Sequence, residues 1–563
     1  MTRAAKLISV ALLIATTTYA GTPANRAADG VREVTVPAGA QVGICVRTIS
    51  GKVLKDINAG QNFIPASNLK LVTTGTALKR LGADFLFETA VAYSGNVDEE
   101  GVLRGDLYII GGGDPTLGSP AALAVPKDSL FARWARAVRG SGIRSIAGSV
   151  VADSRLMPAE VNGSWMYEDR GTYYGATCSA LMFNENCLDI TIAPGAVVGD
   201  RVRLPKVTDV RTDGAEAADK AAKMNSVVCQ RPADRPWMTI MNSCTTGPEG
   251  SGDKSYLLVS ELAPVGHLVG TYAADRKAKA VSYNDPFADF SCAYEFAAFL
   301  EDNGIRCASV TSTALCHPTA TFRETHSPAA DCGTDEGSQE SAGTIAGSQA
   351  VSFGFDTFDT SGNLTYSGRF IPRDSLTTII ATSSPRLSEI IRETLRVSNN
   401  LYAETLLRAL APAGSTEDAL KSESRTLESM GVSTSRVRLD DGSGLSRKNS
   451  VSPEFLVNFL SAMSRQNCFG TYLRALNAPG PDERLFSNAA PETRRRIRLK
   501  SGSMGGVLCY SGYILPPANA ASANGSSNDA SETIAFSIMI NGSTQSTARL
   551  RSYIESVLSE YIR

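Results

Sequence analysis

A serine and a lysine three residues apart, Ser67 and Lys70, have the types and spacing of a nucleophile and its base. Residues three apart lie on one face of a helix, one turn from each other. A serine hydroxyl is a weak nucleophile until a neighbouring group takes its proton. A lysine accepts that proton when burial or a second cation lowers its pKa. The pair is therefore a candidate for nucleophilic catalysis.

The S-x-x-K spacing is weak evidence by itself, because the chain contains it twice. The second copy, Ser251 to Lys254, lies in the Gly-rich stretch 246–252, which predicts a turn. Around Ser67 the neighbours are apolar at helical spacing, and Gly82 follows as a stop signal. The context therefore predicts a helix that begins near Ser67 and ends at Gly82.

A second polar motif, Ser398-x-Asn400, lies between two predicted helices. Ser384-Pro385 is expected to begin the first helix, with the proline at its first position, and apolar residues follow at helical spacing. A second apolar stripe begins at Leu401. We therefore expect this junction to direct the side chains of Ser398 and Asn400 into a cleft.

The third motif, Lys500-Ser501-Gly502-Ser503, continues an apolar stretch that predicts a strand. Gly502 removes a side chain where a strand edge would approach the backbone of a ligand. A hydroxyl, an amine and a bare strand edge at one place indicate a binding site for a polar ligand.

These three motifs occur in the order and contexts found in the penicillin-recognising serine enzymes. The chain resembles one family of them, the D-Ala-D-Ala carboxypeptidase/endopeptidases, or class C low-molecular-mass penicillin-binding proteins. The resemblance covers most of residues 40–560. The stretches that carry it are 65–82, 105–117, 398–404 and 441–447.

The resemblance implies catalytic roles. Ser67 would be the acylated nucleophile, and Lys70 would take its proton. Ser398 would relay a proton to the leaving amine through its link to Lys500. The backbone N–H groups of Ser67 and Ser503 would form an oxyanion hole, typically worth about 3 to 4 kcal/mol per donor.

The resemblance also implies binding roles. Asn400 would hold the peptide amide of the substrate. Lys500 would add positive charge that favours a neutral Lys70 and an anionic substrate tail. The hydroxyls of Ser501 and Ser503 would bind the terminal carboxylate next to Gly502.

Two positions depart from the commonest pattern of the related enzymes. Asn399 stands where they often have Asp, and Ser501 stands where Thr is commoner. The hydroxyl is kept at Ser501, and Asn399 is not the reacting position. We therefore expect the chemistry to be unchanged.

The implied function is serine-type D,D-peptidase action on peptidoglycan stem peptides. The enzyme would attack a D-Ala-D-Xaa bond, release D-alanine or a cross-linked stem, and then hydrolyse the ester. β-Lactams would be covalent inhibitors, and neither a cofactor nor a metal is expected. Two alternatives stay open: a β-lactamase-like hydrolase and a catalytically silent peptidoglycan-binding protein on the same fold.

A long stretch of chain separates Ser67 from Ser398, so their meeting implies inserted domains. We predict an α+β multidomain fold. A discontinuous transpeptidase-like domain of residues 30–84 and 371–563 would have an antiparallel sheet flanked by helices. Residues 85–316 would form large, mostly β inserted domains, and 317–370 a polar flexible linker.

Residues 1–20 have the pattern of a secretory signal peptide. Arg3 and Lys6 precede the apolar run 7–15, and Thr18-Tyr19-Ala20 is a plausible cleavage site. The run is too short to span a bilayer. The sequence therefore predicts export to the periplasm or the extracytoplasmic cell wall, without a transmembrane segment.

Eleven cysteines fit an exported protein better than a cytosolic enzyme. Their pairing stays open, and zinc is the competing use, although the chain has no C-x-x-C and only three histidines. The disulfide candidates are the close pairs Cys178/Cys187, Cys229/Cys244 and Cys307/Cys316.

Other function classes have less support. A net charge of −2 gives no electrostatic case for nucleic acid. Ser-His-Asp catalysis is disfavoured because the chain has no G-x-S-x-G elbow, and His267, His317 and His326 lie in unsuitable contexts. We expect these histidines to have structural roles.

Overall fold

The structure is a computed structural model of the chain. The predicted signal peptide and most of the predicted linker fall outside its described residues. It describes residues 39–157, 159–209, 228–232, 235–313, 316–321, 350–355, 357–358, 364–365, 373–480, 485–517 and 532–562.

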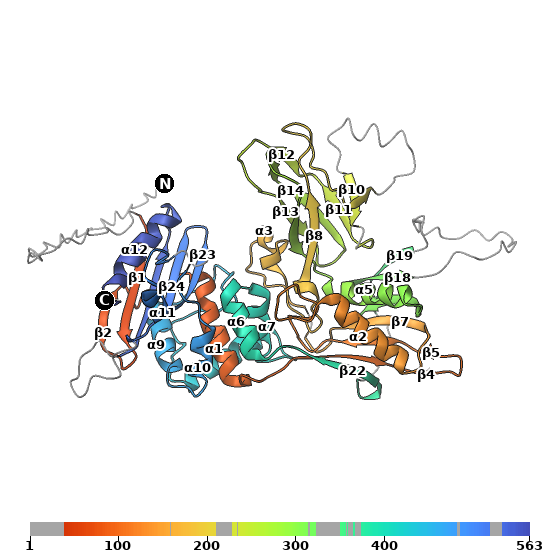
Figure 1. Cartoon of the computed structure of the whole chain (residues 1–563), viewed down its shortest axis with the longest axis horizontal. Helices are drawn as coiled ribbons and strands as arrows, with labels where there is room; N and C mark the ends of the chain where they lie inside the picture. The colour runs from red at the N-terminus through yellow and green to blue at the C-terminus, as the bar shows by residue number, and fades with distance from the viewer. Residues whose placement is uncertain are drawn as a thin grey trace, which may run out of the picture. The chain divides into compact units, whose positions relative to one another are not determined.

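Five antiparallel strands from near the two ends of the chain form the first sheet, in the order β2-β1-β25-β24-β23 (Figure 1). β1 and β2 form an antiparallel hairpin near the N-terminus. β23 is the edge strand that carries the Lys500 motif. The strands are β1 Gln41–Thr48, β2 Val53–Ile57, β23 Ile497–Met504, β24 Val507–Ile514 and β25 Ile534–Asn541.

Helices cover both faces of this sheet, because alternate residues of a strand point to opposite faces. Ile44 and Ile538 pack with the helix α12, whereas Cys45 and Met539 pack in a second cluster with α9. The second cluster also contains α1, the predicted helix that ends at Gly82. The helices of this region are α1 Lys70–Leu81, α6 Leu387–Val397, α7 Asn400–Arg408, α8 Thr416–Ser429, α9 Pro453–Met463, α10 Phe469–Ala475, α11 Pro491–Arg496 and α12 Thr547–Ser559.

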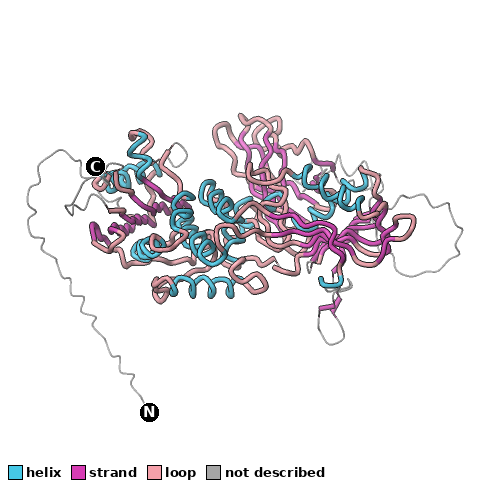
Figure 2. The backbone as a smooth tube through the Cα atoms, turned by 60° about the horizontal axis from the view of Figure 1, so that its bottom comes forward, coloured by secondary structure: helices cyan, strands magenta, loops and turns pink. Residues whose placement is uncertain are grey.

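A second, mixed sheet has the order β19-β18-β17-β7-β6-β3-β22, with β4 and β5 at its side. Figure 2 shows the strands of the chain in magenta, gathered into separate groups. The helices α2 Lys127–Gly140 and α5 Ala288–Asp302 supply its core with aromatic side chains. The strand β22 leads directly back to α6. The strands are β3 Glu88–Tyr93, β4 Asn96–Val97, β5 Val102–Arg104, β6 Leu107–Ile110, β7 Ser145–Asp153, β17 Arg306–Ser312, β18 Cys316–Thr321, β19 Ala350–Phe355 and β22 Thr377–Ser383.

A third group of strands lies between β7 and α5 in the sequence. Its main sheet has the order β13-β14-β11-β10-β9, and two further pairs are β12-β15 and β16-β8. The strands are β8 Cys187–Ile192, β9 Val207–Asp209, β10 Val228–Pro232, β11 Thr239–Asn242, β12 Thr245–Gly247, β13 Tyr256–Val259, β14 Val265–Val269, β15 Thr271–Ala273 and β16 Lys279–Asn284.

Short elements complete the described chain. Three of them, η1, α3 and η2, lie beside the site described below. The elements are η1 Ala66–Leu69, α3 Tyr167–Arg170, η2 Tyr173–Gly175, η3 Asn184–Asn186, η4 Arg373–Ser375, β20 Thr357–Phe358 and β21 Leu364–Thr365.

The predicted start of α6 at Ser384-Pro385 is wrong. The helix begins at Leu387, where Glu389 accepts a hydrogen bond from the backbone N–H of Arg386. The Ser384 hydroxyl instead accepts a hydrogen bond from the backbone N–H of Phe87. The serine therefore joins the segment before β3 to the end of β22.

The observed elements are segregated into sheets with separate helices, as an α+β chain requires. β22 belongs to the second sheet, although the predicted boundaries assign residues 371–563 to the first domain. The domain boundaries remain a prediction.

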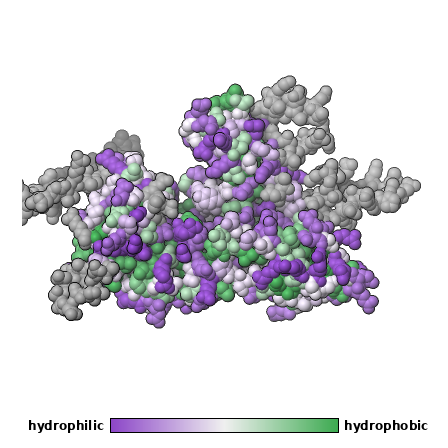
Figure 3. Space-filling view, viewed as in Figure 1, coloured by the Kyte–Doolittle hydropathy of each residue, from purple (hydrophilic) through white to green (hydrophobic). Residues whose placement is uncertain are grey.

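The surface mixes hydrophilic and hydrophobic residues (Figure 3), and none of the described helices is long and apolar enough to cross a membrane.

Candidate active site

Ser67 and Lys70 lie where the 3-10 turn η1 joins α1. Ser67 is within η1, and Lys70 is the first residue of α1. Lys70 is completely buried, whereas Ser67 is half-buried and lines a pocket. Lys70 Nζ lies 2.9 Å from Ser67 Oγ. The predicted helical context therefore brings the two groups into hydrogen-bond contact.

The Lys70 amine has two further partners, both of them carbonyl oxygens. Its Nζ donates to Asn400 Oδ1 at 2.6 Å and to the backbone oxygen of Ser443 at 2.8 Å. A neutral amine has two N–H groups and one lone pair. With both N–H groups given to these acceptors, the lone pair faces the Ser67 hydroxyl, as a general base requires.

Burial and charge both favour the neutral form of Lys70. Burial lowers the pKa of Lys70 well below its usual value, and the positive charge of Lys500 lowers it further. The carboxyl groups of Asp441 and Glu404 oppose this shift with smaller effects. The charge of Lys500 thus acts on Lys70 in the predicted direction, and its role in the chemistry stays a prediction.

Two buried carboxyl groups shape the loop that presents the Ser443 oxygen. Glu404 Oε1 accepts from the backbone N–H of Ser443 at 2.7 Å, and Asp441 Oδ1 accepts from that of Gly444 at 2.8 Å. Burial, with the nearby Asp441, raises the pKa of Glu404 to about 8. The sequence analysis gave Glu404 and Asp441 no role. The backbone partners of Glu404 lie 38 and 39 residues away, whereas those of Asp441 lie within its own loop.

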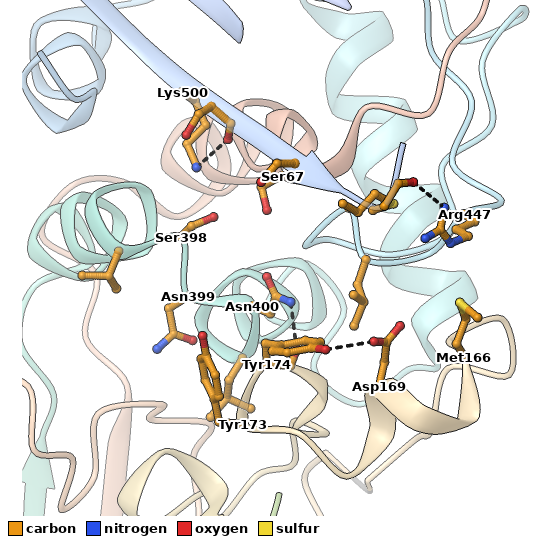
Figure 4. Close-up of a pocket in the computed structure, with 18 of the residues that line it drawn as sticks. Ser67, Met166, Asp169, Tyr173, Tyr174, Ser398, Asn399, Asn400, Arg447 and Lys500 are labelled. Carbon is orange, nitrogen blue, oxygen red and sulfur yellow. Dashed lines mark hydrogen bonds between the residues drawn. The ribbon is translucent and has the colours of Figure 1, made fainter. Parts of the chain in front are cut away.

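Ser398 and Asn400 lie at the predicted helix junction. Ser398 ends α6 with a left-handed backbone, φ 60°, and Asn399 caps α7 by accepting from the backbone N–H of Tyr402. Ser398 points into the pocket toward Ser67 (Figure 4). Asn400 gives its oxygen to Lys70, and its Nδ2 donates to the backbone oxygen of Tyr174 at 2.8 Å.

Asn400 therefore differs from what the sequence led us to expect. The prediction gave its side chain to the peptide amide of the substrate. In the structure its oxygen holds the Lys70 amine, and one of the two hydrogens of its Nδ2 is given to the Tyr174 oxygen. Asn400 therefore also orients Lys70, and the contact of its second N–H with the substrate stays a prediction.

The outer edge of β23 forms another wall of the pocket. Leu499 exchanges backbone hydrogen bonds with Asn477 on the side away from β24. Because backbone groups alternate along a strand, those of Ser501 and Ser503 also point to this outer edge. The Ser503 N–H, on this outer edge, therefore faces the pocket that Ser503 lines, and its role in an oxyanion hole stays a prediction. On the same strand, Lys500 Nζ donates to the backbone oxygen of Ser501 at 2.7 Å.

Gly502 lies against the nucleophile turn. A Cβ atom at this position would lie 2.8 Å from the backbone oxygen of Pro65 and 2.9 Å from the backbone nitrogen of Ser67. The sequence analysis expected the close approach to be made by a ligand. The structure corrects this: the chain's own turn fills the space, and the glycine lets β23 approach Ser67.

The pocket has a volume of about 720 Å³. It brings together the predicted residues Ser67, Ser398, Asn400, Lys500 and Ser501, while Lys70 lies buried beneath it. Ser503 also lines it. A wall from the inserted part was missed by sequence reasoning, because no pattern marks it: Met166, Glu168, Asp169, Tyr173, Tyr174 and Glu185.

Other predicted chemistry lies elsewhere. In the described ranges, no three metal-ligating side chains are grouped to hold an ion. His267 is in β14, where its Nε2 lies 2.8 Å from Ser243 Oγ. Cys178 and Cys187 are free thiols, as are Cys229 and Cys244, so these two candidate disulfides are absent from the structure. The side chain of Cys316, in the third pair, is outside the described set.

Comparison with known proteins gives consistent matches. The sequence matches the D-Ala-D-Ala carboxypeptidase 3 (S13) family over residues 31–240 and 362–560. It is 26% identical to the D-alanyl-D-alanine carboxypeptidase of Actinomadura sp. (strain R39), over 96% of this chain and 87% of that protein. It is 24% identical to penicillin-sensitive carboxypeptidase A of Dictyostelium discoideum, over 89% of this chain and 82% of that protein.

The fold is similar to the crystal structure of penicillin binding protein 4 (dacB) from Haemophilus influenzae. The TM-score is 0.67 at 18% identity, covering 95% of this chain and all of the other (100%). A structure of the same protein complexed with a novel β-lactam matches with a TM-score of 0.64 at 18% identity, over 94% of this chain and 97% of the other. This similarity confirms the predicted fold class.

Proposed function

The chain belongs to the D-Ala-D-Ala carboxypeptidase 3 (S13) family, and from this premise we propose that Ser67 is the nucleophile with which it cleaves peptidoglycan stem peptides. The family makes it a serine-type D,D-peptidase. The attack forms an ester between Ser67 Oγ and the penultimate D-Ala carbonyl, and the C-terminal D-residue departs as an amine. Water then hydrolyses the ester.

The contact between Lys70 and Ser67 is the single observation that carries this proposal. The amine is buried, is favoured in its neutral form, and is fixed by two acceptors so that its lone pair faces the nucleophile. A protein that only bound peptidoglycan would not need this arrangement, since burying an amine costs free energy. The alternative of a silent binding protein is accordingly not favoured, and the family match counts against a β-lactamase-like hydrolase.

The other groups have roles that follow from their places in the pocket. Ser398 faces the nucleophile and would return a proton to the leaving amine. The backbone N–H groups of Ser67 and Ser503 would stabilise the oxyanion. The hydroxyls of Ser501 and Ser503, next to the charge of Lys500, would bind the terminal carboxylate of the substrate.

The charges that line the pocket fit a substrate with both an anionic and a cationic group. Lys500 and Arg447 lie on the side of β23 and the 441–447 loop, whereas Glu168 and Asp169 lie on the inserted wall (Figure 4). Asp169 Oδ1 accepts a hydrogen bond from the Tyr174 hydroxyl at 3.1 Å, which fixes its direction. We expect the acidic wall to favour stems whose third residue carries a free amino group.

β-Lactams resemble the D-Ala-D-Ala end of a stem and would acylate Ser67. One of the structures to which this fold is similar was solved in complex with a β-lactam. The signal-like residues 1–20 support export to the extracytoplasmic cell wall, where such stems occur.

Mass spectrometry of the intact protein with and without benzylpenicillin tests the proposal. We expect one stoichiometric adduct on the Ser67 peptide, and release of D-alanine from a stem pentapeptide. Ser67→Ala should melt like the wild type and form no adduct. An adduct of equal yield on Ser67→Ala would refute the assignment of the nucleophile.

A further inference from the structure

The inserted part of the chain, predicted as residues 85–316, contacts the Ser398-Asn399-Asn400 motif through the carboxylate of Glu185. Glu185 lines the pocket and lies in the short turn η3, just before β8. Its Oε2 accepts a hydrogen bond from Asn399 Nδ2 at 3.3 Å. Its Oε1 accepts from the Tyr402 hydroxyl at 2.9 Å and from the Ser119 hydroxyl at 2.7 Å. One carboxylate thus serves three donors.

The backbone that carries Glu185 is unusual. Asn184, Glu185 and Asn186 all have positive φ values, of 51°, 55° and 51°. A non-glycine residue in the left-handed region is strained, and such residues cluster at functional sites. The turn is fixed from outside: Asn186 Nδ2 donates to the Thr177 oxygen, and the N–H of Asn184 donates to the Leu117 oxygen. The strained turn therefore directs Glu185 toward α7.

The partners of Glu185 lead directly to the base. Asn399 caps α7, and the next residue, Asn400, holds Lys70 Nζ at 2.6 Å. Tyr402 lies one turn further along the same helix. A shift of the carboxylate would move the start of α7 and with it the acceptor that orients Lys70.

We propose that Glu185 is a positioning residue by which the inserted part fixes the Ser398-Asn399-Asn400 segment and hence the base. This inference rests on the proposed function. It also explains Asn399: an amide can donate to Glu185, whereas the aspartate common at this position would face it with a second carboxylate. Asn399 thus donates and Glu185 accepts, so the two side chains are complementary.

Exchanging the polarity of the pair tests the proposal. The measured quantity is the second-order rate of acylation by a fluorescent penicillin, together with the melting temperature. Asn399→Asp keeps a good helix cap, but sets two carboxylates against each other. We expect acylation at pH 8 to fall roughly tenfold through misplacement of the base. Glu185→Gln combined with Asn399→Asp restores a donor facing an acceptor, and should recover most of the rate.

The pH dependence separates this role from a purely structural one. Two facing carboxylates share a proton when the pH falls, so the rate of Asn399→Asp relative to wild type should rise from pH 8 to pH 5.5. Tyr402, Asp114 and Cys187 are other titratable groups near the contact. Burial raises the pKa of Asp114 to about 6 and that of the Cys187 thiol above its usual value. The double variant keeps all three groups, so its pH profile is the reference for that of Asn399→Asp.

Glu249→Gln is the matched control, because it changes an exposed carboxylate of the inserted part, and it should leave the rate unchanged. Equal rates for wild type and Asn399→Asp, or a double variant no faster than Asn399→Asp, would overturn the proposal. A wild type that no penicillin acylates would count against the proposed function instead. The melting temperatures of the wild type, of Glu185→Gln, of Asn399→Asp and of the double variant would then still decide, since zero coupling between the two substitutions also overturns the inference.

Discussion

Two regions of this protein are both buried, but one consists of polar and charged groups and the other of aromatic rings. The cage around Lys70 consists of Asn400, Glu404, Asp441 and the Ser443 oxygen, and it is held by hydrogen bonds to side-chain and backbone groups. The core between α2, α5 and the second sheet contains packed aromatic rings, among them Trp134 and Phe296, which meet edge to face with centroids 5.3 Å apart. Burial of rings stabilises a fold, whereas burial of charged groups costs free energy.

The difference teaches that burial has two uses in this chain. In the aromatic core it provides stability, with a few kcal/mol for each ring. In the Lys70 cage it sets a pKa, because the low polarity around the amine disfavours its charged form. Substitutions in the two regions should therefore affect different measurements.

The largest effect is expected for Lys70→Met, which removes the base and keeps a side chain of similar length. Acylation by penicillin should fall about a thousandfold, while the melting temperature changes little because a buried amine is also removed. Stopped-flow acylation and thermal unfolding measure the two quantities. Lys79→Met, at an exposed position of the same helix, is the control. A Lys70→Met protein that acylates at the wild-type rate would show that another group is the base.

The aromatic core should show the reverse pattern. Phe296→Ala removes a fully buried ring that contacts Phe131 and Trp134. We expect the free energy of unfolding to fall by about 3 to 5 kcal/mol, with an unchanged acylation rate per folded molecule. Urea unfolding provides the test, and Leu262→Ala, at a 68% exposed side chain, should have little effect. A slower acylation in folded Phe296→Ala would mean that the two regions are coupled.

Gly502→Ala should lower both the stability of the fold and the rate of acylation. The added methyl group would meet backbone atoms of Pro65 and Ser67, which cannot move aside as a side chain can. We expect a cost of about 1 to 3 kcal/mol in stability, and slower acylation because the nucleophile is displaced. Gly140→Ala, with open space around its Cβ position, is the matched control. Normal acylation by Gly502→Ala would show that the turn tolerates displacement.

The smallest effect is a change in how stability depends on pH. Burial and the charge of Asp441 raise the pKa of Glu423 to about 7, and Glu423 accepts a hydrogen bond from Thr76 Oγ1. Because the pKa of Glu423 is higher in the folded than in the unfolded protein, the protonated carboxyl stabilises the fold. This stabilisation is complete below the unfolded pKa and is lost as the pH rises through 7. The variant Glu423→Gln does not titrate here, so its free energy of unfolding should rise by about 1 to 2 kcal/mol relative to that of the wild type between pH 5 and pH 8.

Denaturant unfolding at these two pH values measures that gain. Glu428→Gln, on the exposed side of the same helix, should keep the pH dependence of the wild type. A constant difference between Glu423→Gln and wild type at both pH values would contradict the raised pKa of Glu423.

The elements that carry the site could be predicted because their signals are local. The helix after Ser67, the junction at Ser398 and the strand at Lys500 each follow from apolar spacing and a few turn residues within one window. The start of α6 was misplaced because Ser384 has a distant partner, the backbone of Phe87. A cap motif in the sequence does not show which backbone group its hydroxyl will meet.

The sequence by itself determined the three motifs that carry the candidate reacting groups, their order along the chain and the family to which the chain belongs. The tertiary structure alone decided that Asn400 and the Ser443 oxygen hold Lys70, that Gly502 makes room for the nucleophile turn, and that Glu185 reaches α7. The reason is physical. Hydrogen bonds and close contacts between residues hundreds of positions apart depend on how whole elements pack, and no local pattern of residues encodes that packing.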